Sequence, residues 1–210
     1  MHIPNYFKNE NLEEVKNFLI QNSFGILINR TEERLTGTHI PMEIDKNEYG
    51  EDVLVGHVSK ANPQWENFND KEEILAIFNG PHAYVSSSWY EKENVPTWNY
   101  IAVHVYGEIR IIEGDELLDS LRKLVNKHER NSENPVSVEN MSSETLKQIN
   151  GIVGFSIKIN EIQAAYKLSQ NRNQTDYHTI IEKLEKNGNP ISDEVVTEMK
   201  KKSINCKLRR

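Results

Sequence analysis

Polar and aromatic side chains that could hold a ligand are gathered in five short segments. These segments are residues 36–41, 56–65, 78–90, 95–100 and 167–172. Lys60, Lys167 and Arg172 can form charge-assisted hydrogen bonds to an anion such as phosphate. The Trp and Tyr side chains can cover a flat ring system while donating one polar contact each. The inventory suits a phosphorylated aromatic ligand, although composition alone favours turn residues and core aromatics.

The same residue types give little support to metal binding or nucleophilic catalysis. His39, His57, His82 and His104 lie on strand-like segments, and no pair has the i, i+4 spacing of a helical zinc site. The serines at 86–88 lack the Gly-x-Ser-x-Gly frame of a nucleophile elbow. No phosphate loop or dinucleotide fingerprint is present. We therefore expect no metal and assign no catalytic residue.

Composition describes an acidic protein with one basic end. The 210 residues carry a net charge of −7, which disfavours general electrostatic binding of nucleic acid. Residues 198–210 are the exception, with six Lys and Arg against one Glu. No apolar run approaches the roughly 20 residues of a membrane helix, and the first residues do not resemble a secretory signal. We expect a cytoplasmic protein without a membrane partner.

The first half of the chain reads as one helix followed by strands. Leu12, Val15, Phe18 and Leu19 recur at helical spacing, and Asn11 with Glu14 predicts an N-terminal cap. Strands are predicted at 24–29, 34–44, 53–58 and 74–78, the first two joined by a turn at 30–33. Pro41 is predicted to mark an edge or a bulge. Residues 101–111 alternate strictly and predict a strand with one buried face.

The second half alternates helices with one further strand. A helix is predicted from about Asp115, a loop over 129–141, a short helix over 142–149, and a strand with Val153, Phe155, Ile157 and Ile159 on one face. Two closing helices are separated at 188–190, the second beginning at Ser192. The pattern predicts an α+β fold, a β-barrel with flanking helices. We divide it into a domain at 1–187 and a C-terminal helix with a basic tail at 188–210.

Four of these blocks, in this order, resemble the PaiB family of FMN-binding transcriptional regulators. The blocks are Gly56–Trp65, Pro81–Tyr90, Val95–Gly107 and Lys167–Arg172, and the resemblance extends from Met1 to about Leu184. It implies an FMN-binding split barrel, assembled as a homodimer with FMN at the interface. It also implies a negative transcriptional regulator, of the kind that represses protease and sporulation genes. A flavin-dependent oxidoreductase of the split-barrel type is the alternative.

The resemblance further implies a set of FMN contacts. Phosphate and ribityl contacts fall on Thr38, His39, His57, Ser59, Lys60 and Asn62. Trp98 and Asn99 are candidates for covering the ring from the partner chain, and Gln170 and Arg172 for a further phosphate or interface contact.

A transcriptional regulator also implies DNA or a regulatory protein as partner. The closing helices could imitate a helix-turn-helix, but the reading positions would be Ser192, Asp193 and Glu194, and two carboxylates repel phosphate. The basic residues of 200–210 could instead reach phosphates without reading sequence, or could simply be a solvated end. We expect any DNA effect to act through this tail or through a protein partner.

Overall fold

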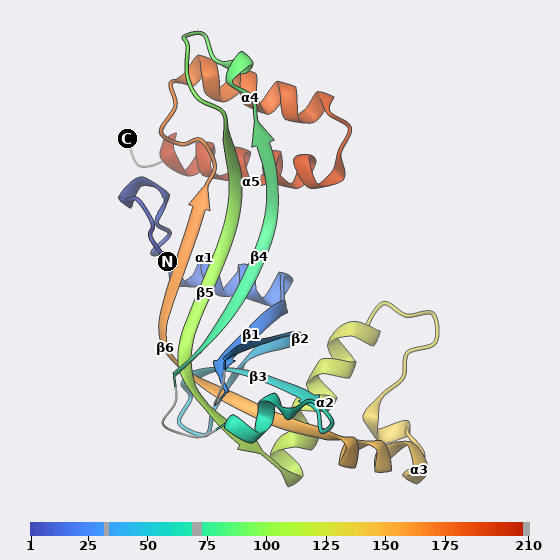
Figure 1. Cartoon of the computed structure of the whole chain (residues 1–210). Coiled ribbons are helices and arrows are strands. Elements are labelled where there is room, and N and C mark those ends of the chain that lie inside the picture. The colour runs from blue at the N-terminus through green and yellow to red at the C-terminus, as the bar shows by residue number, and fades with distance from the viewer. Residues whose placement is uncertain (32–33, 69–72, 208–210) are drawn as a thin grey trace. The chain divides into compact units, whose positions relative to one another are not determined.

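The computed structural model describes residues 1–31, 34–68 and 73–207, with side chains described up to Lys202 (Figure 1). The expected turn at 30–33 therefore lies partly outside the described residues, as do the side chains of Cys206, Lys207, Arg209 and Arg210. The chain forms two compact units. The barrel unit contains Lys16–Phe78 and His104–Ile162, and the helical unit contains Met1–Val15, Asn79–Val103 and the stretch from Gln163 onward.

A closed antiparallel barrel with strand order β1-β2-β3-β6-β5-β4 confirms the predicted α+β class. The strands are β1 (Phe24–Arg30), β2 (Leu35–Lys46), β3 (Asp52–Ser59), β4 (Glu73–Val85), β5 (Thr97–Ile112) and β6 (Ile152–Lys167). The last three are longer than predicted, and each contributes residues to both units. Side chains of Leu27, Met42, Leu54, Phe78 and Phe155, all fully buried, fill the barrel.

Strand β2 serves two neighbours in succession. Its first part pairs with β1 as far as Phe24 opposite Pro41, and its second part pairs with β3 from Met42 opposite Gly56. Pro41 thus lies where β2 changes from one neighbouring strand to the other. It is not at a free edge, so the prediction of an edge position is wrong. The exchange suits proline because its missing N–H is not needed at the end of a ladder.

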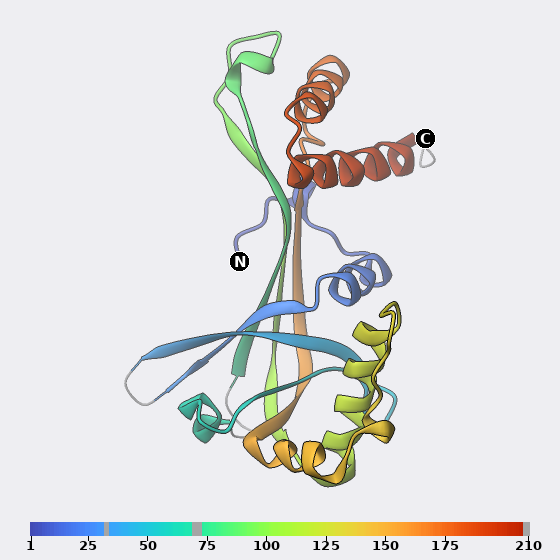
Figure 2. The ribbon, with the colours of Figure 1, turned by 90° about the vertical axis from the view of Figure 1, so that its right-hand side faces the viewer.

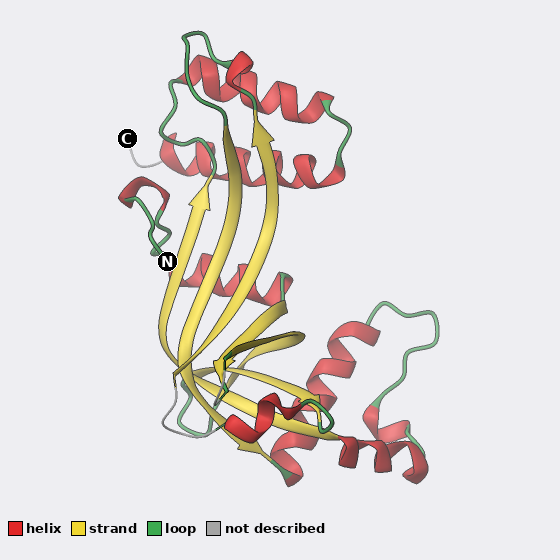
Figure 3. Cartoon of the chain, viewed as in Figure 1, coloured by secondary structure: helices red, strands yellow, loops and turns green. Residues whose placement is uncertain are grey.

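Helices of the barrel unit cover its outer surface. These are the C-terminal part of α1 (Leu12–Gln21), α2 (Gly114–Glu129) and the short α3 (Ser143–Leu146), drawn with the strands in Figure 3. The predicted alternation of β6 fails at Gly154 and Ser156, which are buried together with Phe155 and Ile157. At Gly154 the reason is α2, because a Cβ on this residue would lie only 2.5 Å from the Leu117 side chain.

The N-terminal cap of α1 is as predicted, since the Glu14 amide donates to the Asn11 side chain at 3.2 Å. Val15, Phe18 and Leu19 are buried, but Leu12, at the first helical position, is 59% exposed. The apolar face of this helix is therefore shorter than its sequence indicates.

In the helical unit, α4 (Gln174–Lys186) and α5 (Pro190–Lys207) form an antiparallel pair, visible side by side in Figure 2. The chain reverses at Gly188, whose φ of 61° suits a residue without a Cβ. Ile180, Leu184, Val195 and Met199 are buried, as their spacing predicts. The Tyr177 hydroxyl donates to the Met199 carbonyl at 2.7 Å, which ties the start of α4 to α5.

Candidate functional site

One buried side-chain amide organises the corner between β1, β2 and the end of β3. Gln64, in the 3-10 helix η2 (Pro63–Asn67), is fully buried. Its Nε2 donates to the Leu27 carbonyl at 3.1 Å and to Asn29 Oδ1 at 2.8 Å, and lies 3.3 Å from the Thr36 carbonyl. Its Oε1 accepts a hydrogen bond from the Thr38 hydroxyl. The segment after β3 is thereby joined to both β1 and β2.

Asn62 connects this amide to the turn that follows β3. Its Oδ1 accepts from the Gln64 amide at 3.0 Å and caps η2, a usual role for Asn. Its Nδ2 donates to Thr38 Oγ1 at 2.9 Å, and its own amide donates to the Ser59 carbonyl at 2.9 Å. Thr38 and Asn62 therefore hold the turn 59–62 in place.

Lys60 is presented by this turn with its backbone held from both sides. Its amide donates to the Gly151 carbonyl at 2.8 Å, and its carbonyl accepts from Trp65 Nε1 at 2.9 Å. The Lys60 side chain is exposed, and no described carboxylate forms an ion pair with it. Ser59 beside it accepts from the Ala61 amide at 3.3 Å, which leaves the serine hydroxyl proton free to donate.

The two histidines lie on strands that flank the turn. His57 precedes Ser59 by two residues on β3, so both side chains leave the same face of the strand. Burial lowers the pKa of His57, which favours the neutral imidazole at pH 7. His39 lies on β2 on the face opposite Thr38, is exposed, and stacks on Phe24 with ring centroids 6.4 Å apart.

The remaining predicted contacts lie in the helical unit, where their side chains contact other residues of that unit. Trp98 is 52% exposed, with its ring centroid 5.9 Å from that of Tyr84 and 6.0 Å from that of His82. Asn99, its neighbour, is fully buried. Its Oδ1 accepts from the Ser169 hydroxyl at 2.9 Å, so its amide is used inside the fold.

Gln170 and Arg172 belong to the turn after β6. Gln170 closes this turn on itself, since its Oε1 accepts from the Leu168 amide at 2.7 Å and its Nε2 donates to the Tyr166 carbonyl at 2.5 Å. The guanidinium of Arg172 lies over the Tyr90 ring, 4.5 Å from its centroid. The ten predicted residues thus divide into six around the barrel corner and four in the helical unit.

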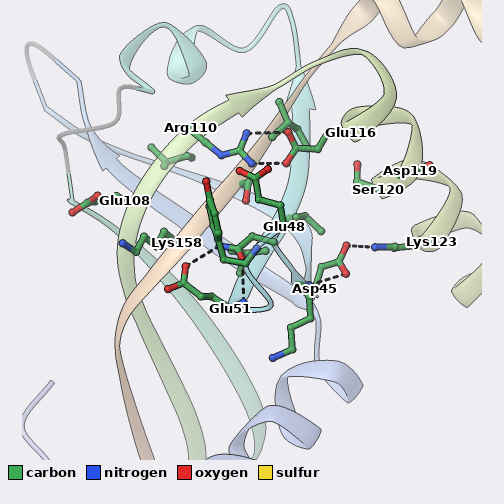
Figure 4. A pocket seen from close by; sticks show the side chains of 18 of the residues that line it. Asp45, Glu48, Glu51, Glu108, Arg110, Glu116, Asp119, Ser120, Lys123 and Lys158 are labelled. Carbon is green, nitrogen blue, oxygen red and sulfur yellow. Dashed lines mark hydrogen bonds and ion pairs between the residues drawn. The ribbon is translucent and has the colours of Figure 1, made fainter.

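A cavity of about 630 Å³ in the barrel unit lies elsewhere (Figure 4). It is enclosed by the β2–β3 turn, β5, β6 and α2, and it includes none of the ten predicted residues. Seven carboxylates line it against four basic side chains. Three of the basic groups are already paired, Arg110 with Glu116 at 2.5 Å, Lys123 with Asp45 at 2.5 Å and Lys46 with Asp52 at 2.7 Å. Such a lining repels a phosphate, so the cavity does not fit a phosphorylated ligand.

Residues 1–161 match the family described as "Putative FMN-binding domain". The chain belongs to this family. It is 46% identical over 203 residues to the Protease synthase and sporulation protein PAI 2 of Bacillus subtilis, covering 96% of this chain and 98% of that protein. An uncharacterized protein of Emericella nidulans is 30% identical over 73% of this chain and 76% of its own length. The predicted PaiB-like family is therefore confirmed.

Solved structures confirm the split-barrel fold. The FAD and heme binding protein of Mycobacterium smegmatis superposes with a TM-score of 0.59 at 12% identity, over 77% of this chain and 73% of that one. The flavocytochrome Anf3 of Azotobacter vinelandii gives a TM-score of 0.56 at 16% identity, over 84% and 78% of the two chains. At these identities the likeness concerns the fold alone.

The family match also supports FMN as the cofactor, in agreement with the sequence prediction. The barrel corner fits a phosphorylated flavin in its donor set, because Lys60 supplies a cation without a described carboxylate partner and Ser59 a free hydroxyl proton. Gln64 is not among the predicted contacts, although it lies within the segment 56–65. An uncharged residue gives no sign in sequence that its amide will be buried.

Replacing Gln64 with leucine tests the role of the network. The Gln64→Leu variant leaves Asn29 and Thr38 without their partner, so we expect the free energy of unfolding to fall by about 1–3 kcal/mol. The measurement is urea unfolding at 25 °C. Gln21→Leu, at the exposed end of α1, is the control and should change stability by no more than about 0.5 kcal/mol. Equal stability of the two variants would contradict this role.

Proposed function

We propose that this protein is a homodimeric, FMN-binding negative regulator of transcription. The observation that carries the FMN site is Lys60, a cation held by its backbone at the end of β3 and left without a described carboxylate partner. The regulatory role is taken from the 46% identical relative, whose name refers to protease synthesis and sporulation. A cytoplasmic location stays a prediction.

Within the proposed site, five residues have definite tasks. Lys60 binds the FMN phosphate and Ser59 donates its hydroxyl proton to the same group. Thr38 and Asn62 act as positioning residues, because their side chains are engaged with Gln64 and with each other. His57, favoured in its neutral form by burial, can donate or accept a hydrogen bond without adding charge. FMN supplies the redox chemistry of its isoalloxazine ring when bound.

Dimerisation is supported by an exposed aromatic group on β4 and β5. Trp98 and Tyr84 are 52% and 48% exposed and contact each other edge to face. Exposed aromatic side chains of this size are enriched at interfaces, where they bury apolar area and cover flat rings. We propose that Trp98 of one copy helps to cover the flavin bound by its partner. Asn99 supports the fold beside it through the Ser169 hydrogen bond.

The phosphate contact of Lys60 gives a direct test. Lys60→Met should weaken FMN binding by about 10- to 100-fold, which corresponds to the usual contribution of a hydrogen bond to a charged group. Binding of riboflavin, which lacks the phosphate, should not change. Both are measured by quenching of flavin fluorescence, with Lys147→Met, an exposed lysine of the same unit, as control. Unchanged FMN affinity in Lys60→Met would place the phosphate elsewhere.

The basic C-terminal segment is less free than its sequence indicates. Residues up to Lys207 belong to α5, and Lys200, Lys201 and Lys202 form ion pairs with Glu185, Glu198 and Glu14. The cations that remain as candidates for DNA are Lys207, Arg209 and Arg210. A chain ending at Lys202 keeps the buried Met199 and the paired lysines while removing all three.

This shortened chain tests DNA contact through the tail. Its affinity for a duplex of arbitrary sequence should fall, since phosphate contacts read no sequence. The slope of log affinity against log salt should decrease in magnitude by about 2 to 3, reflecting up to three lost phosphate contacts. Gel retardation at several salt concentrations measures both quantities. Identical behaviour of the two chains would assign the DNA effect to a protein partner.

One redox experiment distinguishes a transcriptional regulator from the alternative, a flavin-dependent oxidoreductase. A regulator whose flavin has no dedicated electron donor should keep its yellow colour when NADH or NADPH is added to the FMN-loaded protein without oxygen. The measurement is flavin absorbance over minutes, with dithionite as the positive control for reduction. Rapid bleaching by either nicotinamide would favour the flavoenzyme over the regulator.

A further inference from the structure

Lys167 and Arg172 are cations of the helical unit that have no described acidic partner and are nevertheless held in place by the fold. Lys167 ends β6 and Arg172 precedes α4 by two residues. Neither forms an ion pair with any described carboxylate, although the chain as a whole is acidic. The nearby Asp176 is occupied, because one oxygen accepts from the Glu91 amide at 2.9 Å and the other from Asn173 Nδ2 at 3.0 Å.

Lys167 is partly withdrawn from water. Its ammonium group donates to Thr97 Oγ1 at 2.5 Å and lies 5.8 Å from the centroid of the Phe7 ring. Burial, and next the charge of Arg172, lower the pKa of Lys167. Two positive charges are thus held near each other, which costs free energy unless an anion lies between or beside them.

Arg172 is fixed in orientation by an aromatic ring. Its guanidinium packs over Tyr90, which is only 9% exposed, and its Nη2 lies 3.4 Å from the Tyr90 hydroxyl oxygen. Stacking of this kind leaves the edge of the guanidinium free for a bidentate contact. The side chain is therefore presented in one orientation rather than moving freely at the surface.

The turn between the two cations is rigid and strained. Ser169 has a positive φ of 60°, a conformation that non-glycine residues adopt at a cost. It is retained because its hydroxyl donates to the buried Asn99 and its carbonyl accepts from the Arg172 amide at 3.0 Å. A second hydrogen bond stabilises the turn, because the Leu168 amide donates to Gln170 Oε1. The spacing of Lys167 and Arg172 is consequently set by the fold.

We propose that Lys167 and Arg172, with the hydroxyls of Thr97 and Tyr90, form a binding site for a phosphate monoester in the helical unit. Two fixed positive charges complement a ligand with two negative charges, such as a phosphate monoester, better than a ligand with a single carboxylate. Thr97 and Tyr90 each accept from a cation and so keep their own protons to donate to phosphate oxygens. The two cations lie outside the segment 1–161 that matches the FMN-binding family.

Inorganic phosphate is the probe that tests this site. The full-length chain carrying Lys60→Met, which removes the proposed flavin-phosphate cation, is titrated calorimetrically at pH 7 and constant ionic strength. We expect one phosphate to bind per chain. Adding Lys167→Met or Arg172→Met should weaken this binding at least tenfold, whereas adding Lys183→Met, an exposed lysine of α4, should leave it unchanged.

Controls keep the result interpretable if a variant is destabilised. Each variant is melted without phosphate, and Arg172→Lys, which keeps the charge but loses the planar fork, should bind phosphate with intermediate affinity. Absence of phosphate binding in the Lys60→Met chain would overturn the proposal. Equal binding by the Lys167, Arg172 and Lys183 variants would overturn it as well.

The source of the phosphate is decided by a second comparison. The ratio of FMN to riboflavin affinity is measured in chains that keep Lys60 and carry Arg172→Met or Lys183→Met. A lower ratio in the Arg172 variant means that the site binds the FMN phosphate. An unchanged ratio, together with lost binding of inorganic phosphate, means that it binds a separate phosphorylated molecule. Failure of the proposed FMN function would appear in the Lys60 experiment and not here.

Discussion

A buried side-chain amide has two N–H donors and an oxygen with two lone pairs, and each group left without a partner costs free energy. Gln64 meets this demand through β1 and β2, in bonds to Leu27, Asn29 and Thr38. The turn that carries Ser59 and Lys60 is attached to the same network through Asn62. The position of the candidate phosphate ligand therefore depends on an uncharged residue that does not itself reach solvent.

The charged side chains of the protein are distributed unevenly over its surface. The chain has a net charge of −7, and much of the acidic surface in the barrel unit is gathered around the cavity beside α2. Lys200, Lys201 and Lys202 of α5 are paired with carboxylates along and beside the helix. Lys60, Lys167 and Arg172 have no such described partner, and hydrogen bonds or an aromatic ring hold each of them in place. A cation that the fold holds in place without a carboxylate partner can form charge-assisted hydrogen bonds with an anionic ligand.

Single residues show which features of the fold the sequence predicts and which it does not. Asn11 and Glu14 predict the helix cap that is found, and the spacing of Ile180, Leu184 and Val195 predicts the buried faces of α4 and α5. Thr38 and Asn62 were selected as flavin contacts, but their side chains face each other and Gln64. Asn99 likewise faces Ser169 inside the helical unit. Residue type indicates that such groups will form hydrogen bonds without indicating with whom.

By itself the sequence determined the α+β class, the order of the elements, the family and the cofactor class. The class and the order of elements follow from local periodicity and turn residues, whereas the family and the cofactor class follow from the resemblance of four blocks of residues to a known family. Only the tertiary structure decided that Gln64 is the central amide, that Gly154 packs against α2, and that Lys167 and Arg172 flank one rigid turn. The physical reason is that burial and hydrogen-bond partners depend on segments distant in sequence, such as Thr38 with Asn62 and Asn99 with Ser169.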